Sequence, residues 1–314
     1  MASSLDNLAA TVDAGEPLSD ADITALASTR DIISLGMLAT TVRRKLHGTD
    51  VTYVRVADLK IEGDVEPKGT VLPTTAGEIR IFHTPHNLNV AVEIVAKARE
   101  GAKDTPLSAF CLFELSRLPE GLPVVLRVLK QAGLRLIAQA PLDRLKAPEQ
   151  ALEAVTDAGL ELARLTIDAT PERPWEAVCR DISALQTKLR SIRAFAPLAR
   201  TIDPAEPTTG YEDVRRIALS RLLIGNVDTI QVDWALYGPK LAQVALTFGA
   251  DDIDSVSAED DDSKGHRRSP IEEIHRSIRA AGFEPVERDG HFGDRRSAIV
   301  DRPSPIADRR SPIP

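Results

Sequence analysis

The chain contains little cysteine and few aromatic residues. Among its 314 residues are two cysteines, Cys111 and Cys179, and aromatic residues make up 4%. Two cysteines cannot build a disulfide framework, so we expect a reduced, cytoplasmic protein in which both thiols are buried as small apolar groups. Because aromatic rings are scarce, Leu, Ile, Val and Ala must fill the core, which suits alternating strands and helices.

Several classes of function lack their usual signals. The formal net charge of −8 argues against nucleic-acid binding, because phosphate contacts need a basic surface. No apolar run is long enough to span a bilayer, and the N-terminus lacks the basic and apolar regions of a signal peptide. The chain also has no P-loop, no Rossmann glycine fingerprint and no serine-hydrolase elbow.

Residues 1–48 have the pattern of helices. Ser19 is placed as an N-cap, and Asp22 follows three residues later as the acidic partner of a capping box. Apolar residues then recur at helical spacing, and three cations at 43–45 stand where they favour a helix C-terminus. We therefore predict an N-terminal helical segment over 1–48.

From residue 49 to 290, short β-rich runs alternate with helical patterns. We predict strands at 51–56, 79–83, 107–113, 134–138, 164–168, 191–196 and 229–234. We predict helices between most of them, at 87–100, 120–131, 148–158, 173–188, 211–223 and 238–248. This alternation indicates a parallel sheet, and seven such units fit a partial or closed TIM-type (β/α) barrel better than a doubly wound sheet.

Three segments interrupt this pattern. The connection 57–78 is rich in Gly and Pro and is expected to be a loop or small hairpin. The acidic run 251–268 is expected to be a solvated loop, since it lacks the Gly and closing Glu that a calcium loop needs. A last helix is predicted at 270–281. The tail 291–314 repeats Asp-Arg-Arg-Ser and is predicted to be disordered, either inert or a phosphorylation or docking site.

Two stretches resemble the menaquinone-biosynthesis radical-SAM family of aminofutalosine synthase and dehypoxanthine futalosine cyclase. One comprises GEPLSDAD at 15–22 and LGMLATTVRRKLHG at 35–48. The other comprises PTTGYEDVRRIALSRLL at 207–223 and GPKLAQVALTFGADDID at 238–254. The resemblance covers roughly 10–290. It implies a radical-SAM-like barrel acting in or near futalosine-dependent menaquinone biosynthesis.

The chain departs from that family at the iron–sulfur cluster. Family members carry a C-x-x-x-C-x-x-C motif after the first barrel strand, and its three thiolates hold a cluster that binds S-adenosylmethionine. Here the corresponding region, 56–73, contains no cysteine. We therefore predict that a 4Fe-4S cluster is absent, and with it radical chemistry. The function that we predict is that of a pseudoenzyme. It would bind S-adenosylmethionine or a nucleoside ligand, or pair with an active paralogue or a second copy.

Polar residues at predicted strand ends suggest a site even without a cluster. His83 and His86 follow one strand, and Glu114, Asp168 and Asp233 end or follow others, at the barrel face where chemistry occurs. His83, His86 and Asp168 form a candidate metal set, or the histidines are merely hydrogen-bonded loop residues. The candidate catalytic residues of such a repurposed metal or acid–base enzyme are His83, Glu114 and Asp233.

Glu114 has a second candidate role. It matches an acidic position that the resemblance places at the end of the third strand, so it is a candidate cofactor-binding residue that accepts a ribose hydroxyl. The alternative is an ion pair with an arginine inside the barrel, because lone carboxylates are seldom buried unpaired.

Overall fold

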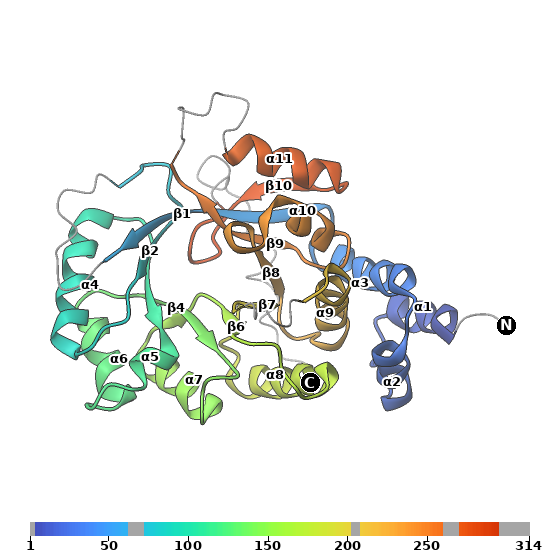
Figure 1. The fold of residues 1–314 in the computed structure, drawn as a ribbon, viewed down its shortest axis with the longest axis horizontal. Coiled ribbons are helices and arrows are strands. Elements are labelled where there is room, and N and C mark those ends of the chain that lie inside the picture. The colour runs from blue at the N-terminus through green and yellow to red at the C-terminus, as the bar shows by residue number, and fades with distance from the viewer. Residues whose placement is uncertain (1–3, 62–71, 202–207, 260–269, 295–314) are drawn as a thin grey trace.

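The computed structural model describes residues 4–61, 72–201, 208–259 and 270–294 (Figure 1). Most of the expected tail, and about half of each of the two expected loops, therefore lie outside the described residues. The segments that are described contain a barrel of strands, a ring of helices around it and three further helices at the N-terminus.

Eight parallel strands close into a barrel in the order β1-β2-β3-β4-β6-β7-β8-β9, with β9 paired back to β1. This confirms the prediction of a TIM-type barrel, and of the partial and closed forms that the sequence allowed, the structure has the closed one. In addition, β5 (Glu161–Leu162) pairs with β4, and β10 (Glu284–Glu287) pairs with the first residues of β1. The barrel strands are β1 (Asp50–Lys60), β2 (Glu78–Phe82), β3 (Leu107–Cys111), β4 (Leu136–Pro141), β6 (Leu165–Ile167), β7 (Ala194–Ala199), β8 (Thr229–Asp233) and β9 (Asp252–Ser257).

Helices cover the outside of the barrel, as the alternating pattern predicts (Figure 1). Each buries an apolar face against the strands; on α6, for example, Val125, Leu126 and Leu129 are fully buried. The outer helices are α4 (Leu88–Ala102), α5 (Leu112–Leu115), α6 (Leu122–Gln131), α7 (Pro148–Asp157), α8 (Trp175–Leu189), α9 (Gly210–Leu223), α10 (Trp234–Leu246) and α11 (Pro270–Ala280).

The three N-terminal helices form a separate layer at one side of the barrel (Figure 1). They are α1 (Ser4–Ala14), α2 (Asp20–Ser28) and α3 (Ile32–His47). The predicted capping box is confirmed, because the Ser19 side chain accepts from Asp22 N while the Asp22 carboxylate accepts from Ser19 N. Helix α3 packs on α9, with a second apolar core that includes Leu35 and Leu219.

The prediction of a solvated acidic loop was wrong at its first residues. Asp251, Asp252 and Asp254 are 3%, 0% and 0% exposed, and β9, which begins at Asp252, is the eighth barrel strand. Each carboxylate is paired with an arginine far away in the sequence. The run of aspartates has the pattern of a solvated loop in the sequence, because its arginine partners are not close to it along the chain. Residues 260–269 lie outside the description.

Some element boundaries also differ from the predictions. Strand β1 continues to Lys60, four residues beyond the predicted end. Strand β3 stops at Cys111, because Phe110 takes a left-handed backbone conformation and the chain turns directly into α5. Helix α10 starts at Trp234 and is broken at Gly238, whose φ of 78° falls in the region that favours glycine.

The chain after β10 covers the amino-terminal end of the barrel. Gly290 N donates to Gly77 O at 3.0 Å, and Arg193 Nη1 donates to His291 O at 2.7 Å on another side. Arg288 adds an ion pair with the buried Asp252. The first residues of the expected tail, His291–Asp294, thus lie against the barrel. The carboxyl ends of the strands form the opposite end, where the predicted site residues are found.

Candidate functional site

The predicted site residues lie where parallel strands end, but the structure does not gather them into one centre. His83 follows β2, Glu114 lies in α5 directly after β3, and Asp168 follows β6. Asp233 is the last residue of β8. Each side chain has its own neighbours, and these neighbours decide what it can do.

Asp233 is held on both carboxylate oxygens. One oxygen accepts from Leu236 N at 3.0 Å and thereby caps α10. The other lies 3.1 Å from Arg200 Nη2 and 3.1 Å from Ser255 Oγ. With 4% of its surface exposed, Asp233 is a buried, fully partnered residue that positions the start of α10.

Asp168 is engaged at the rim of the barrel. Its carboxylate accepts from Arg144 Nη1 at 2.5 Å and from Thr201 Oγ1 at 3.0 Å. The Arg144 guanidinium also lies over the Phe113 ring, 4.3 Å from its centroid. This cluster joins the segments that follow β3, β4, β6 and β7.

Glu114 forms an ion pair with Arg117 at 3.3 Å, one turn further along the chain. The alternative expectation placed an arginine partner inside the barrel, whereas this pair lies at the rim, since the Arg117 side chain is 66% exposed. A role in holding a ribose hydroxyl stays a prediction.

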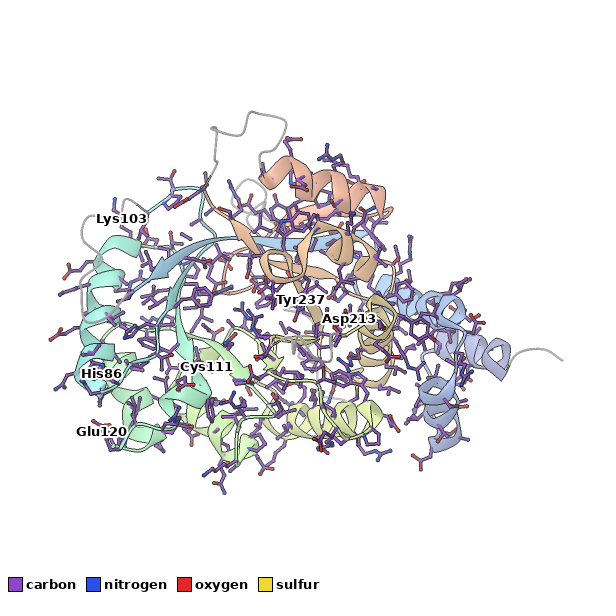
Figure 2. The ribbon with its side chains drawn as sticks, in the orientation of Figure 1. His86, Lys103, Cys111, Glu120, Asp213 and Tyr237 are labelled. Carbon is purple, nitrogen blue, oxygen red and sulfur yellow. The ribbon has the colours of Figure 1, made fainter. Side chains whose placement is uncertain are left out.

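The two histidines do not share a centre with Asp168. His83 Nδ1 lies 3.1 Å from Ile61 O. His86 is exposed and lies at the outer edge of the molecule near the start of α4 (Figure 2). Across the described ranges, no group of three or more His, Cys, Asp and Glu side chains is placed to hold a metal ion. The geometry therefore gives the metal prediction no support.

Sequence reasoning missed an ion-pair network inside the barrel. Arg80 on β2 donates to both oxygens of Asp254 on β9, at 2.8 and 3.1 Å, and Arg164 donates to the same carboxylate. Burial alone raises the pKa of Asp254, but the charges of Arg164 and Arg80 outweigh it and hold that pKa well below its usual range. Arg80 also donates to Glu78 at 2.9 Å.

Asp58 lies near the mouth of the barrel, which is the end formed by the carboxyl ends of the strands. It stands two residues before the end of β1, and its side chain is exposed. Nevertheless, desolvation by the surrounding protein raises its pKa, and Arg80 and Asp254 are among the charges that act on it. The predicted strand ended at 56, so the sequence did not show that Asp58 belongs to this mouth.

Cys111 and Tyr237 lie on two different sides of the mouth, Cys111 at β3 and Tyr237 at α10 (Figure 2). The Tyr237 hydroxyl donates to Ala199 O at 2.8 Å. Burial raises the pKa of Tyr237 and also that of Cys111. Both groups are therefore protonated at neutral pH, which makes the tyrosine a hydrogen-bonding group and not a base.

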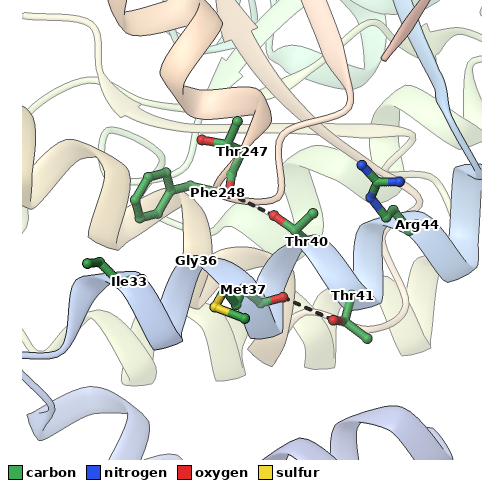
Figure 3. Close-up of a pocket in the computed structure, with 8 residues that line it drawn as sticks. All are labelled: Ile33, Gly36, Met37, Thr40, Thr41, Arg44, Thr247 and Phe248. Carbon is green, nitrogen blue, oxygen red and sulfur yellow. Dashed lines mark hydrogen bonds between the residues drawn. The ribbon is translucent and has the colours of Figure 1, made fainter. Parts of the chain in front are cut away.

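Two surface cavities lie outside the barrel, on α3. One, of about 500 Å³, is lined by residues of α3 together with Thr247 and Phe248 (Figure 3). The other, of about 440 Å³, lies between α1 and α3. Met37, which is 67% exposed, lines both. These cavities are mainly apolar and hold no set of reactive groups.

The residues present do not fit a radical-SAM iron–sulfur cluster. Such a cluster needs three thiolates close together. Cys111 ends β3, and Cys179 is fully buried in α8, a different part of the barrel wall. The loop after β1 has no cysteine in its sequence. No chemical step through such a cluster is derived for this chain.

Comparison with known proteins finds similarity to aminodeoxyfutalosine synthases. Residues 195–299 match the family model "CofH/MqnC C-terminal region". The chain is 26% identical to the aminodeoxyfutalosine synthase of Thermus thermophilus over 90% of this chain and 93% of that protein. It is 38% identical to the aminodeoxyfutalosine synthase of Streptomyces coelicolor, over 27% of this chain and only 23% of that protein.

A solved structure supports the fold. The crystal structure of methylornithine synthase (PylB) superimposes with a TM-score of 0.63 at 14% identity, covering 89% of this chain and 97% of that one. Among the described helices, none is long and apolar enough to cross a membrane. The chain is thus similar to an aminodeoxyfutalosine synthase over most of its length, and its residues 195–299 match the CofH/MqnC C-terminal region, on a closed parallel (β/α) barrel.

Proposed function

We propose that this protein is a ligand-binding member of the futalosine-type radical-SAM family that holds no iron–sulfur cluster and performs no radical chemistry. The position of its two thiols carries the proposal. Cys111 and Cys179 belong to different elements, and the segment that bears the family's cluster motif has none. The similarity to aminodeoxyfutalosine synthase supports a ligand from menaquinone biosynthesis or a neighbouring pathway.

The mouth of the barrel supports ligand binding. Asp58 offers a solvent-reachable carboxylate, which can accept hydrogen bonds from a ribose or an amino group. Arg200, directly after β7, and Tyr237, in α10, add polar groups. We propose a nucleoside or S-adenosylmethionine as the ligand.

Iron and sulfide analysis after anaerobic reconstitution tests the first part. We expect well below one cluster per chain, with the same value in a Cys111→Ser/Cys179→Ala double variant, because neither thiol belongs to a cluster site. Four irons and four sulfides per chain, with cluster absorbance that the double variant loses, would overturn the proposal.

Calorimetric titration with S-adenosylmethionine and with adenosine tests the second part. We expect Asp58→Asn to weaken binding by about tenfold, the loss of one charge-assisted hydrogen bond. Asp157→Asn, at an exposed position in α7, serves as the control and should bind like the unchanged protein. Binding that ignores Asp58 would contradict a ligand in the mouth.

An acid–base or metal enzyme remains the alternative. It has less support, because Asp168 and Asp233 are already held by arginines and His83 and Asp168 are not gathered around a metal. Metal analysis of the purified protein, with His83→Ala as the variant, tests it.

We also propose that the protein is cytoplasmic and associates with an active paralogue or a second copy. Size-exclusion chromatography with light scattering would show such an association.

A further inference from the structure

Arg164 has an unused binding edge inside the barrel. It lies directly before β6, and 1% of its surface is exposed. Its Nη1 group donates to Asp254. Its Nε and Nη2 groups are also buried, and they find no acceptor among the described residues. The edge formed by these two groups is therefore unpaired in a place where water does not reach it.

Elsewhere in this protein, the same edge of arginine holds a carboxylate. Arg288 donates from Nε and Nη2 to the two oxygens of Asp252, at 2.5 and 2.7 Å. Arg55 uses Nε and Nη2 on the two oxygens of Glu287, at 3.0 and 3.3 Å. This fork geometry matches a carboxylate in a way that single donors cannot. The empty edge of Arg164 is thus shaped for a planar oxyanion.

A second buried group points to the same absent acceptor. Thr166 is 0% exposed, and its Oγ1 finds no partner in the described part of the chain. It stands two residues after Arg164 on the way to the barrel mouth, so the period of a strand places both on one face. Each buried donor left without a partner costs about 1–3 kcal/mol, which favours an occupant that accepts from these groups.

The local charges favour an anion. Arg164 shares the single carboxylate of Asp254 with Arg80. The positive charge of Arg200 also acts on Arg164. Burial and the charge of Arg80 lower the pKa of Arg164 to about 10, although Asp254 and Asp233 act in the opposite direction. An added negative charge would offset both effects.

Asp58 lies near Arg164, on the side of the barrel mouth. Asp58 is exposed, and Arg164 is among the charges that act on it. A ligand that enters past Asp58 therefore approaches the buried guanidinium from the carboxyl ends of the strands.

We infer that the Nε–Nη2 edge of Arg164, with the Thr166 hydroxyl, binds the carboxylate of a small ligand inside the barrel. The inference rests on the proposed function in one respect, that the barrel binds a ligand. It does not depend on whether a cluster is present. Iron analysis and the experiment below can therefore fail separately.

The test is a titration of full-length protein with sodium acetate at constant ionic strength, followed by ¹⁵N NMR of the arginine Nε–H groups. Acetamide, the neutral analogue, and nitrate, a planar inorganic anion, are the comparison probes. We expect one Nε–H resonance to shift saturably with acetate and not with acetamide.

Arg164→Lys keeps the charge but lacks the fork, and should weaken acetate binding at least about tenfold. Arg55→Lys is the matched control, since its edge is already occupied, and should bind acetate normally.

Thr166→Val keeps the test decisive if Arg164→Lys does not fold. It should weaken acetate binding about threefold to tenfold, the effect of losing one hydrogen bond to a charged group. Three results would overturn the inference: equal responses to acetate and acetamide, acetate binding unchanged in Arg164→Lys or Thr166→Val, or a shift with nitrate alone. The last would indicate a site for inorganic anions and not for a ligand carboxylate.

Discussion

Arg80 and Asp254 form a two-point ion pair across the inside of the barrel, with Nη2–Oδ1 and Nη1–Oδ2 distances of 2.8 and 3.1 Å. They come from β2 and β9, which are separated in the barrel wall by β1. Both side chains are about 1% exposed. Buried charges of this kind are stable only while each has its partner, so the pair ties three strands of the barrel into one unit.

Asp254→Asn should destabilise the protein strongly. The substitution leaves the guanidinium groups of Arg80 and Arg164 buried without their shared counter-charge, and breaking such a pair costs about 3–5 kcal/mol. Urea unfolding followed by circular dichroism measures the change. The control is Lys188→Ala, which removes the exposed ion pair with Glu149 and should cost less than about 1 kcal/mol. Equal losses in both variants would contradict the importance of the interior network.

His47 and Asp251 should make stability depend on pH. His47 Nε2 lies 2.6 Å from Asp251 Oδ2, where α3 meets the barrel. Burial alone lowers the pKa of His47, but the charge of Asp251 and its hydrogen bond together outweigh burial and raise that pKa. Burial alone raises the pKa of Asp251, but the charges of Arg221 and His47 outweigh burial and lower that pKa.

The direction of the effect follows from these shifts. A raised histidine pKa stabilises the fold below the unfolded value of about 6.5, and this contribution is lost as pH rises through the folded pKa. The lowered pKa of Asp251 stabilises the fold above about pH 4, and that contribution is lost as pH falls. The free energy of unfolding should therefore fall by up to about 1 kcal/mol between pH 6 and 9, in keeping with a partly exposed pair. His47→Gln should remove this slope in urea titrations; a slope that survives the substitution would place its cause elsewhere.

Gly290→Ala should loosen the segment that covers the amino-terminal end of the barrel. A Cβ at this position would lie 3.0 Å from both Glu78 Cγ and Pro106 Cβ, closer than ordinary contacts. Forcing a methyl group into such a space costs about 1–3 kcal/mol, which thermal unfolding would report. Gly225→Ala is the control, because nothing lies within 4 Å of its Cβ and it does not need a positive φ. A melting temperature as high as that of the control would show that the segment yields easily.

The two thiols should react very differently. Cys179 is 0% exposed, and burial raises its pKa to about 12, so it should not react with Ellman's reagent while the protein is folded. Cys111 is partly exposed at the end of β3, but burial raises its pKa too, and it should react slowly. We expect at most one thiol per native chain and two in guanidinium chloride. In Cys111→Ser the native protein should give none, and fast reaction there would mean that α8 opens readily.

Local patterns in the sequence were sufficient for most elements of the fold. The capping box at Ser19 and Asp22 depends on residues three apart, and the structure contains it as predicted. The alternation of strands and helices indicated the barrel, which closes through the β1–β9 pairing. The closing strand, β9, was nevertheless missed. Its aspartates are typical of a solvated loop, and their buried partners Arg80 and Arg288 are distant in the sequence.

The sequence by itself determined the barrel class, the family resemblance and the lack of clustered cysteines, because each depends on residues close together in the chain. Only the tertiary structure decided which charged groups are buried together. Arg80, Arg164 and Asp254 are far apart in the sequence, and only closure of the barrel brings them into contact. The structure also decided that His83 and Asp168 have separate partners, Ile61 O and Arg144, which strand order alone does not reveal.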